Sequence, residues 1–227
     1  MAGAETLTAM YDAMRQHFGP SNWWPSLAGD ETPAGQLEIC VGAILTQNTN
    51  WGNVEKALGN LHAAGLMSVE ALAELPREQL AELIRPAGYY NVKAKRLGNF
   101  VSHVRDTFGD DISAFLARPA YTLREELLGI NGIGRETADS MILYAAGLAV
   151  FVVDTYTARV FGRHGLISPE DDYDGIQEFF ESSLPEDVAF WNDFHAQIVA
   201  VGKNFCKPTP RCPGCPLESF PHDLEEF

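Results

Sequence analysis

The sequence predicts an all-helical protein. The pattern of apolar residues is helical along most of the chain, and helix ends fit local chemistry: Gly65 ends one helix, Asn91 can cap another, and Pro76 and Pro86 break the chain. No Asn-Gly turn joins alternating strands, and no Gly-rich phosphate loop follows a strand. Helices are expected over residues 4–18, 35–49, 51–64, 68–74, 77–85, 91–108, 112–117, 121–128, 135–147, 154–165, 173–183 and 187–204.

The helix expected over residues 135–147 has little polar face beyond its first turn, so it should lie centrally. The apolar run 149–153 could pass for a strand, but the sequence shows no partner strand. We therefore expect a buried, extended connection into a helix that begins at Asp154. Gly147 ends the preceding helix, and a domain boundary is expected near 148–153.

The bulk composition is typical of a cytosolic globular protein. The 227 residues suffice for one domain or two small ones, and the apolar and charged fractions are ordinary. No stretch approaches the ~20 apolar residues of a membrane span, and the N-terminus lacks the features of a signal peptide. We expect a cytoplasmic protein with no membrane partner.

The net charge of −15 argues against a general polyanion-binding protein, because such proteins are usually basic. Nucleic-acid binding would therefore need local positive charge, with weak and salt-sensitive affinity. Acidic residues concentrate elsewhere in the chain. The basic residues that could supply this charge are Lys93, Lys95, Arg96 and Arg135, with Lys203, Lys207 and Arg211 near the end.

A Gly-x-Gly turn between Gly129 and Gly134 joins two predicted helices. Glycines allow positive φ and let a ligand come close to the backbone. The free N–H groups that open the next helix, together with its dipole, form an anion site suited to a backbone phosphate. The competing interpretation is a tight helix–helix turn in which glycine only aids packing.

Asp154 is the candidate catalytic carboxylate, since it follows four apolar residues and begins a predicted helix. Cleavage of a glycosidic bond passes through an oxocarbenium-like sugar, which a nearby carboxylate stabilises. The same group can orient or deprotonate water. The simpler interpretation is a helix N-cap, a position that favours aspartate. Both roles are compatible, because a capping carboxylate has a fixed position.

Three cysteines, Cys206, Cys212 and Cys215, cluster near the end of the chain, whereas Cys40 stands alone in an apolar run. In a cytosolic chain such a cluster indicates a metal or iron–sulfur site rather than disulfides. Cys40 is expected to be a small, buried apolar residue.

These motifs together resemble the helix-hairpin-helix, Gly-Pro-Asp (HhH-GPD) superfamily of DNA base-excision glycosylases, and within it the endonuclease III branch. The resemblance covers nearly the whole chain. It rests on residues 127–159, on Thr46-Gln47-Asn48-Thr49 and on Gly88-Tyr89-Tyr90-Asn91-Val92-Lys93-Ala94. The ordered set of motifs is specific, although each alone would be weak.

The resemblance implies a fold of two all-helical lobes flanking a DNA-binding cleft. A six-helix barrel with the hairpin would span residues 29–148, and residues 1–28 and 149–227 would form the lobe that carries the catalytic aspartate and an iron–sulfur loop. Gln47 and Asn48 would belong to a loop that wedges into duplex DNA. The other implied DNA-binding residues are Tyr90, Asn91, Lys93, Gly132, Gly134 and Arg135. The alternatives are capping or packing for Gln47, the core for Tyr90, and solvated charges for Lys93 and Arg135.

Glu136 departs from the endonuclease III pattern, in which a lysine follows the turn and forms a Schiff base with the sugar. A carboxylate cannot form an imine. The resemblance therefore implies a monofunctional glycosylase that uses water, with Asp154 and Glu136 as the catalytic residues. The alternative for Glu136 is an ordinary first-turn acid favoured by the helix dipole. Tyr156 replaces a histidine common in that branch, which weakens the case for oxidised pyrimidines.

A Trp-Trp-Pro segment near the N-terminus resembles a related subgroup that excises 3-methyladenine. Trp23, Trp24, Pro25 and Trp51 would form its base pocket, because aromatic faces attract electron-poor or cationic bases. Glu136 would add negative charge near the bound base. The paired tryptophans could instead belong to the core, which is their usual place. Phe194-His195 also resembles this subgroup, although Gln197 replaces a lysine there.

The cysteine cluster lies where endonuclease III carries a [4Fe-4S] cluster, which four thiolates normally bind. Here the first spacing is one residue short, and Pro221 occupies the expected place of the fourth cysteine. The resemblance implies Cys206, Cys212 and Cys215 as ligands, completed by His222, by Asp223 or by solvent. The alternatives are a zinc site of three Cys and one His, or a metal-free relic.

We therefore expect a base-excision DNA repair glycosylase that hydrolyses the N-glycosidic bond of damaged, alkylated bases. It would be a monomer that binds damaged or double-stranded DNA in the cytoplasm, associated with the nucleoid. Two alternatives remain. One is an endonuclease III-like glycosylase for oxidised pyrimidines with weak AP lyase activity. The other is a catalytically silent helix-hairpin-helix DNA-binding protein.

Overall fold

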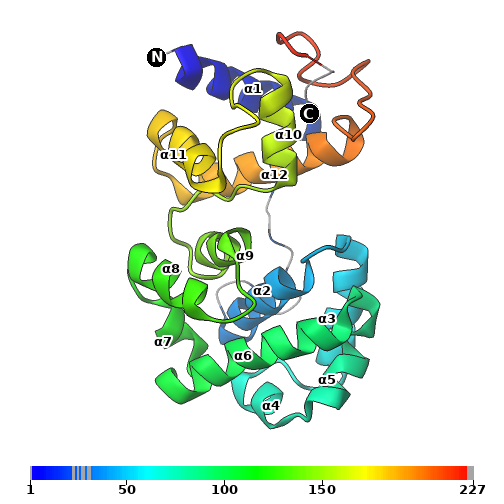
Figure 1. Ribbon diagram of the computed structural model, residues 1–227, viewed down its shortest axis with the longest axis vertical. Coiled ribbons are helices and arrows are strands. Elements are labelled where there is room, and N and C mark those ends of the chain that lie inside the picture. Colours follow the sequence, from blue (N-terminus) through cyan, green and yellow to red (C-terminus); the bar gives the residue numbers. More distant parts are fainter. Residues whose placement is uncertain (1, 22–23, 25, 27–28, 30–31, 224–227) are drawn as a thin grey trace. The chain divides into compact units, whose positions relative to one another are not determined.

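The structure is a computed structural model that describes residues 2–21, 24, 26, 29 and 32–223 (Figure 1). Within these residues every regular element is a helix, so the predicted all-helical class is confirmed. None of the described helices is both long and apolar enough to cross a membrane. The helices are α1 (Ala2–Phe18), α2 (Pro33–Leu45), α3 (Trp51–Ala63), α4 (Val69–Glu74), α5 (Arg77–Leu83), η1 (Arg85–Ala87), α6 (Tyr90–Phe108), α7 (Ile112–Leu116), α8 (Ala120–Gly129), α9 (Arg135–Ser140), η2 (Met141–Ala145), α10 (Thr155–Arg163), α11 (Tyr173–Ser183) and α12 (Val188–Asn204).

The chain divides into two compact units. The middle unit comprises residues 24–148 and holds α2 to α9 together with η1 and η2. The terminal unit joins residues 1–23 to residues 149–227 and holds α1 and α10 to α12.

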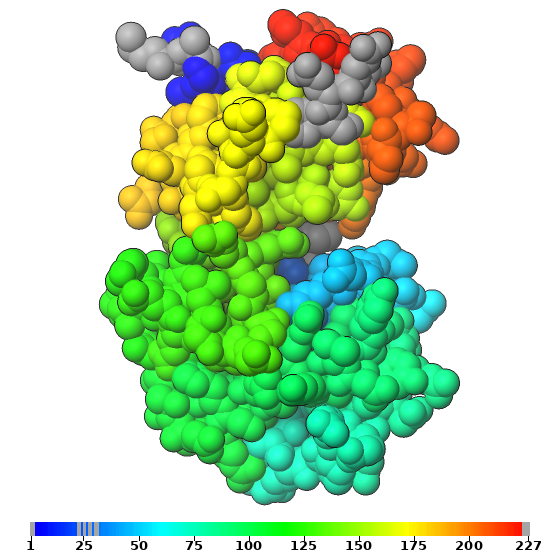
Figure 2. Space-filling view, viewed as in Figure 1, coloured from blue at the N-terminus to red at the C-terminus, as the bar shows by residue number. Residues whose placement is uncertain are grey.

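The core helix of the middle unit is α2. Every residue from Leu37 to Leu45 is buried, and the helix packs against α3, α6, α7, α9 and η2. A helix that is apolar all round is a buried one, and little of α2 reaches the surface in the view of Figure 2. Cys40 is fully buried in it, as predicted, and burial raises the pKa of its thiol. Cys40 therefore stays protonated and acts as a small apolar residue.

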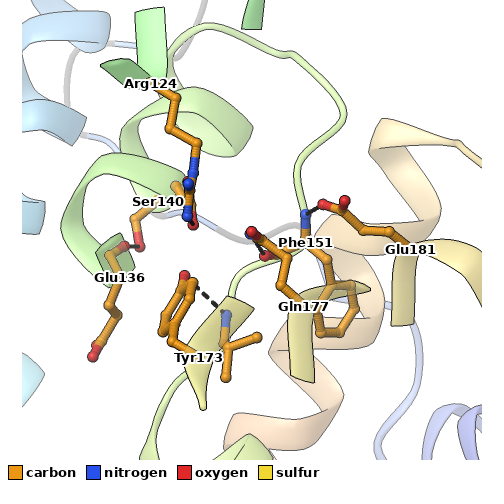
Figure 3. Close-up of polar contacts among 9 residues, drawn as sticks. Arg124, Glu136, Ser140, Phe151, Tyr173, Gln177 and Glu181 are labelled. Atoms are coloured by element: carbon orange, nitrogen blue, oxygen red, sulfur yellow. Dashed lines mark hydrogen bonds and ion pairs between the residues drawn. The ribbon is translucent and has the colours of Figure 1, made fainter. Parts of the chain in front are cut away.

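The helix predicted over residues 135–147 is central, as expected, but it is not one regular α-helix. The α-helix α9 ends at Ser140, and the chain continues as the π-helix η2, in which Ala146 N donates to Met141 O at 3.0 Å. Ser140 Oγ donates to Glu136 O at 2.7 Å (Figure 3). A serine hydroxyl that bonds back to the preceding turn competes with the backbone ladder and often bends a helix. Single π-turns are frequent near functional sites.

The core of the terminal unit is a cluster of phenylalanines between α10, α11, α12 and the segment that precedes α10. Phe151 stacks on Phe180 with ring centroids 4.3 Å apart, and Phe161 and Phe194 contact Phe180 edge-on. All four rings are fully buried. The helices α1 and α10 both pack on α12, which is therefore the scaffold of this unit.

The apolar run 149–153 forms a buried, extended connection, as predicted, and its backbone is satisfied by side chains instead of a partner strand. Phe151 N donates to Glu181 Oε1 at 2.8 Å, and Phe151 O accepts from Gln177 Nε2 at 2.7 Å (Figure 3). The Tyr173 hydroxyl accepts from Val153 N at 3.4 Å. Buried backbone groups need such partners, so α11 fixes the segment that leads to Asp154.

Replacement of Gln177 by leucine should destabilise the protein, because the buried Phe151 carbonyl would lose the Gln177 donor. We expect Gln177→Leu to lower the free energy of unfolding by ~1–3 kcal/mol, measured by urea unfolding. The neighbouring exposed residue provides the control, and Glu178→Gln should leave the unfolding midpoint unchanged. Equal midpoints for Gln177→Leu and the wild type would contradict this role.

Candidate functional site

The predicted turn between α8 and α9 is a tight hairpin in the middle unit. Ile130 and Ile133 are buried and anchor the hairpin, and Ile133 N donates to Ile130 O at 3.1 Å. Gly132 has φ of 107°, and a Cβ added to it would lie 2.3 Å from Arg96 Cγ. Glycine is therefore required at residue 132 both for its backbone conformation and for space. Gly134 is the N-cap of α9 and supplies no side-chain cap.

A buried ion pair fixes the two helices of the hairpin to each other. Arg124 on α8 donates from Nε and Nη2 to the two carboxylate oxygens of Asp139 on α9, at 2.7 and 3.1 Å. The side chain of Asp139 is fully buried. A bidentate guanidinium–carboxylate pair defines geometry as well as charge, so the angle at which α9 leaves the turn is held firmly.

Gln47 lies against this hairpin. Helix α2 ends at Leu45, four residues earlier than expected, and the residues that follow form a turn. Gln47 Nε2 donates to Gly132 O at 3.1 Å and to Thr137 Oγ1 at 3.0 Å. Its Oε1 accepts from Arg96 Nη1. The next residue, Asn48, is exposed, and its backbone is in the left-handed region with φ of 54°. The proposed wedge loop and the hairpin are thus joined within one unit.

Lys93 requires a correction. It was expected to contact phosphate, but it is only 1% exposed, and its Nζ donates to Leu45 O and Ala87 O at 2.7 Å each. The last carbonyls of a helix lack partners within the helix, and Lys93 satisfies those at the ends of α2 and η1. Burial, with a smaller contribution from Arg96, lowers the pKa of Lys93 to about 8. Lys93 therefore shapes the base of the Gln47 turn.

The basic residues that do reach the surface line a hollow beside the hairpin. Lys95 and Arg77 are exposed there, and Asn91 is exposed as well. Arg135 is exposed on the first turn of α9, as is Glu136. Tyr90 is half-buried beneath the Arg85 guanidinium, 5.6 Å from its ring centroid, whereas Tyr89 is 72% exposed. The hollow is lined by Arg77, Glu78, Asn91, Val92, Lys95, Arg96, Asn131 and Gly132.

An aromatic cluster surrounds Trp24 in the middle unit. The Trp51 ring meets the Trp24 ring edge-on, with ring centroids 4.9 Å apart. The ring centroid of Tyr144 lies 5.2 Å from that of Trp24. A Cβ on Gly42 would come within 3.3 Å of the Trp24 ring, so this glycine makes room for it. Trp24 is buried and Trp51 is half-buried. The predicted pocket residues Trp23 and Pro25 lie outside the described residues.

Tyr144 was missed by the sequence reasoning. It belongs to η2, the continuation of the helix that carries Glu136. The sequence signal that could have identified it is an aromatic residue on the helix that follows the hairpin. Its significance depends on contact with Trp24, which is 120 positions away along the chain and could not be read from spacing.

Asp154 begins α10 in the terminal unit as its N-cap. Its Oδ1 accepts from Thr157 N at 2.7 Å and from Thr157 Oγ1 at 2.9 Å, and its own N–H donates to Thr157 Oγ1 at 3.3 Å. Its Oδ2 lies 3.6 Å from His195 Nε2, which is beyond hydrogen-bonding distance. Burial alone would raise the pKa of Asp154, but His195 and Thr157 together lower that pKa below its usual value. Asp154 is therefore a carboxylate.

Gln197 and Tyr156, which depart from the family pattern, both make structural contacts in the terminal unit. Gln197, which stands where a lysine was expected, donates to Gly19 O at 2.7 Å and to Asp193 Oδ1 at 3.2 Å. Tyr156 packs on Gly202, where a Cβ would lie 2.2 Å from Tyr156 Cδ1. Gln197 thus joins α12 to the residue that follows α1, and Tyr156 packs α10 on α12.

The three clustered cysteines and His222 line one cavity in the terminal unit, together with His164. Burial raises the pKa of the Cys215 thiol, and the neighbouring thiols of Cys206 and Cys212 raise it further. Among the residues that the structure describes, no three His, Cys, Asp or Glu side chains come close enough to hold a single metal ion. Thiolates of a [4Fe-4S] cluster bind different iron atoms, so this wider spacing does not oppose a cluster.

A buried arginine supports the same cavity. Arg163 is 3% exposed, and its Nη1 donates to Cys206 Sγ at 3.2 Å and to Lys207 O at 2.7 Å. Its Nη2 donates to Pro208 O at 3.0 Å. Hydrogen bonds to the cysteine sulfurs are a regular part of iron–sulfur sites. These donor residues therefore fit an iron–sulfur group.

The unusual ionisation of Lys93 gives a testable pH dependence. Because its pKa falls from 10.5 to about 8 on folding, the unfolded chain binds more protons between these values, and Lys93 makes stability rise with pH there. The neutral amine retains two donors for its two carbonyl partners. We expect the unfolding free energy of wild type minus that of Lys93→Met, measured in urea, to grow from pH 8 to pH 10. Lys95→Met, at an exposed position, is the control and should give a flat difference.

Comparisons with known proteins place the chain in a family. The model of the HhH-GPD superfamily of base excision DNA repair proteins matches residues 41–186. A Methanocaldococcus jannaschii protein named DNA repair glycosylase MJ1434 is 43% identical, with 95% of this chain and 96% of that protein covered. Endonuclease III of Thermotoga maritima is 28% identical, with 81% of each chain covered.

Solved structures of DNA repair enzymes are also similar to this chain. The H. pylori 3-methyladenine DNA glycosylase bound to 1,N6-ethenoadenine has a TM-score of 0.74 and 31% identity, with 88% of this chain and 97% of that chain covered. A trapped endonuclease III–DNA covalent intermediate, at 24% identity, shares the fold with a TM-score of 0.77, covering 94% and 93%. The chain therefore belongs to the HhH-GPD superfamily and is a base-excision DNA glycosylase.

Proposed function

We propose that this protein releases alkylated, 3-methyladenine-type bases from DNA by hydrolysis and leaves the sugar–phosphate strand intact. The observation that carries the proposal is Glu136. It lies exposed on the first turn of α9, where an amine would be needed for strand cleavage, while a buried carboxylate is retained at Asp154. The relative bound to ethenoadenine, at 31% identity, supports a modified purine as substrate.

Asp154 would act on the sugar. As the base departs, positive charge develops on the sugar ring, and an adjacent carboxylate stabilises it. Asp154 suits this role because His195 and Thr157 keep it ionised despite burial. The same carboxylate can orient the attacking water or accept its proton. Glu136 has no imine chemistry available to it, so water remains the nucleophile.

The aromatic cluster would recognise the base. Alkylated purines are electron-poor and often cationic, and aromatic faces attract such rings. Trp24 and Trp51 would form the pocket together with Tyr144, and we include Trp23 and Pro25 from the sequence motif. Glu136 would add negative charge near a cationic base. Because alkylation already weakens the glycosidic bond, stacking and one carboxylate suffice.

The middle unit would hold the DNA. The hairpin residues Gly132 and Gly134 would bring backbone N–H groups to a phosphate, and Arg135 and Lys95 would add charge beside them. Gln47 and Asn48 would fill the duplex where the base is flipped out, with Tyr90 and Asn91 nearby. Because these basic side chains would contact phosphates, binding should weaken as the salt concentration rises. The protein would act as a monomer associated with the nucleoid.

The cysteine loop would carry a [4Fe-4S] cluster. Cys206, Cys212 and Cys215 would bind it, and His222 would be the fourth ligand, because its Nδ1 is engaged with Phe220 O at 2.8 Å while Nε2 is the nitrogen left to ligate. The cluster would hold the loop in shape when bound.

The cluster assignment can be checked by analysis of the metal. Anaerobically purified protein should contain about four iron atoms per chain and little zinc. His222→Ala should keep the cluster but make it more easily lost to air, because one protein ligand would be replaced by solvent. A chain that holds about one zinc and no iron would contradict the assignment.

Base release is the direct test of function. Purified protein is incubated with duplex DNA carrying 3-methyladenine or thymine glycol, and free base and strand breaks are measured with and without alkali. We expect 3-methyladenine to be released, with strand breaks only after alkali. Asp154→Asn should slow release roughly 10²- to 10⁴-fold and leave DNA binding intact, since Asn is also a good N-cap.

The other outcomes identify the two rival functions. Cutting of the thymine-glycol strand without alkali would indicate an endonuclease III-like enzyme with another amine as nucleophile. That alternative is favoured by the 28% identity to the T. maritima endonuclease III. DNA binding with no release from either duplex would indicate a catalytically silent protein.

A further inference from the structure

His195 makes a contact that the mechanism above does not explain. It lies on α12, is 6% exposed, and places Nε2 3.6 Å from Asp154 Oδ2. We propose that His195 is a positioning residue, which fixes the plane of the Asp154 carboxylate. The proposal rests on the proposed catalytic role of Asp154 and adds the residue that makes that role possible.

The N-cap contacts alone do not orient this carboxylate. Both bonds from Thr157, through its N–H and its hydroxyl, go to Oδ1 of Asp154. The χ2 torsion of aspartate is broad rather than confined to narrow wells. A carboxylate held by one oxygen can therefore swing its other oxygen. The contact with His195 is made by Oδ2, so it restricts the motion that the cap leaves free.

The position of His195 is itself held from both sides along α12. Asp193, two residues earlier, accepts from Tyr11 Oη at 2.6 Å and from Ser21 N at 2.7 Å. Gln197, two residues later, donates to Gly19 O at 2.7 Å. These bonds tie α12 to the middle of α1 and to the segment after it. The His195 side chain is thus carried on a rigid helix.

Asp154 and the residue before it are met by polar groups from three helices of the terminal unit. From α10 it meets the Thr157 hydroxyl, from α12 the His195 imidazole, and from α11 the Tyr173 hydroxyl bonds the preceding residue, Val153, at 3.4 Å. A buried carboxylate without a partner favours its protonated form. Loss of His195 would therefore both loosen Asp154 and reduce its negative charge.

A purely structural role for His195 would have a different consequence. The α10 cap is complete without it, because Oδ1 receives both Thr157 donors. Removal of the imidazole should therefore alter the reacting carboxylate more than the fold. The distinction can be measured, since catalysis, DNA binding and stability are separate quantities.

The variants are chosen to separate the Nε2 contact with Asp154 from the bulk of the ring. His195→Ala removes the contact, and His195→Gln restores an N–H donor near the place of Nε2. Asn192→Ala, at a half-buried neighbour on α12, is the matched control. Each variant is compared with the wild type by single-turnover base release, by DNA half-saturation and by thermal unfolding. The double variant His195→Ala/Asp154→Asn completes a mutant cycle.

We expect His195→Ala to slow single-turnover release on the order of 10- to 100-fold without changing DNA half-saturation. His195→Gln should recover most of this loss, and the double variant should be no slower than Asp154→Asn alone, because the two residues act as a unit. A wild-type rate for His195→Ala would overturn the proposal. So would a loss that appears in DNA binding, or a loss that His195→Gln does not recover.

A second measurement needs no substrate and keeps this proposal separate from the proposed function. Carbon-13 NMR of the side-chain carboxyls follows the titration of Asp154 in the wild type and in His195→Ala. Because burial raises the pKa of Asp154 and His195 opposes it, the midpoint should move to higher pH in the variant. An unchanged midpoint would overturn the positioning role. A shifted midpoint with no release of 3-methyladenine by the wild type would instead refute only the proposed function.

Discussion

A carboxylate that stays ionised while nearly buried is the constraint on which the terminal unit depends. Burial favours the neutral acid, so Asp154 needs several interactions that stabilise its charged form. The cap of α10 gives two donors to one oxygen, and His195 faces the other. The buried strand-like segment before it is fixed by Gln177 and Glu181 of α11. Much of this unit thus serves to place and charge a single side chain.

The middle unit solves a different problem, which is to hold a short glycine turn rigidly enough to grip DNA. Arg124 and Asp139 lock the two helices of the hairpin, and Gly132 lets the turn close against Arg96. Gln47 is bonded to the same turn, while Lys93 closes the end of the helix that precedes Gln47. The Gln47 turn and the hairpin, which are both proposed to contact DNA, are therefore joined by direct hydrogen bonds. A substitution in one should change the conformation of the other.

Local patterns predicted the helices, the hairpin and the cap at Asp154, because each depends on residues close in sequence. The apolar run 149–153 was also correctly expected to be buried without a strand partner. Lys93 was assigned wrongly, since its partners Leu45 and Ala87 lie on other elements. Tyr144 was not identified for the same reason, and His195 was noted for its resemblance to the 3-methyladenine subgroup but not as a partner of Asp154. Their importance comes from Trp24 and Asp154, and distances of that kind arise only from tertiary packing.

The central claim is that water, not an amine of the protein, takes the place of the departing base. Borohydride trapping tests this most directly, because it reduces any Schiff base between enzyme and sugar to a permanent cross-link. With Glu136 in place of the lysine, the protein acting on 3-methyladenine duplex should release base and form no cross-linked species on a denaturing gel. A covalent protein–DNA band that accumulates with base release would contradict the claim.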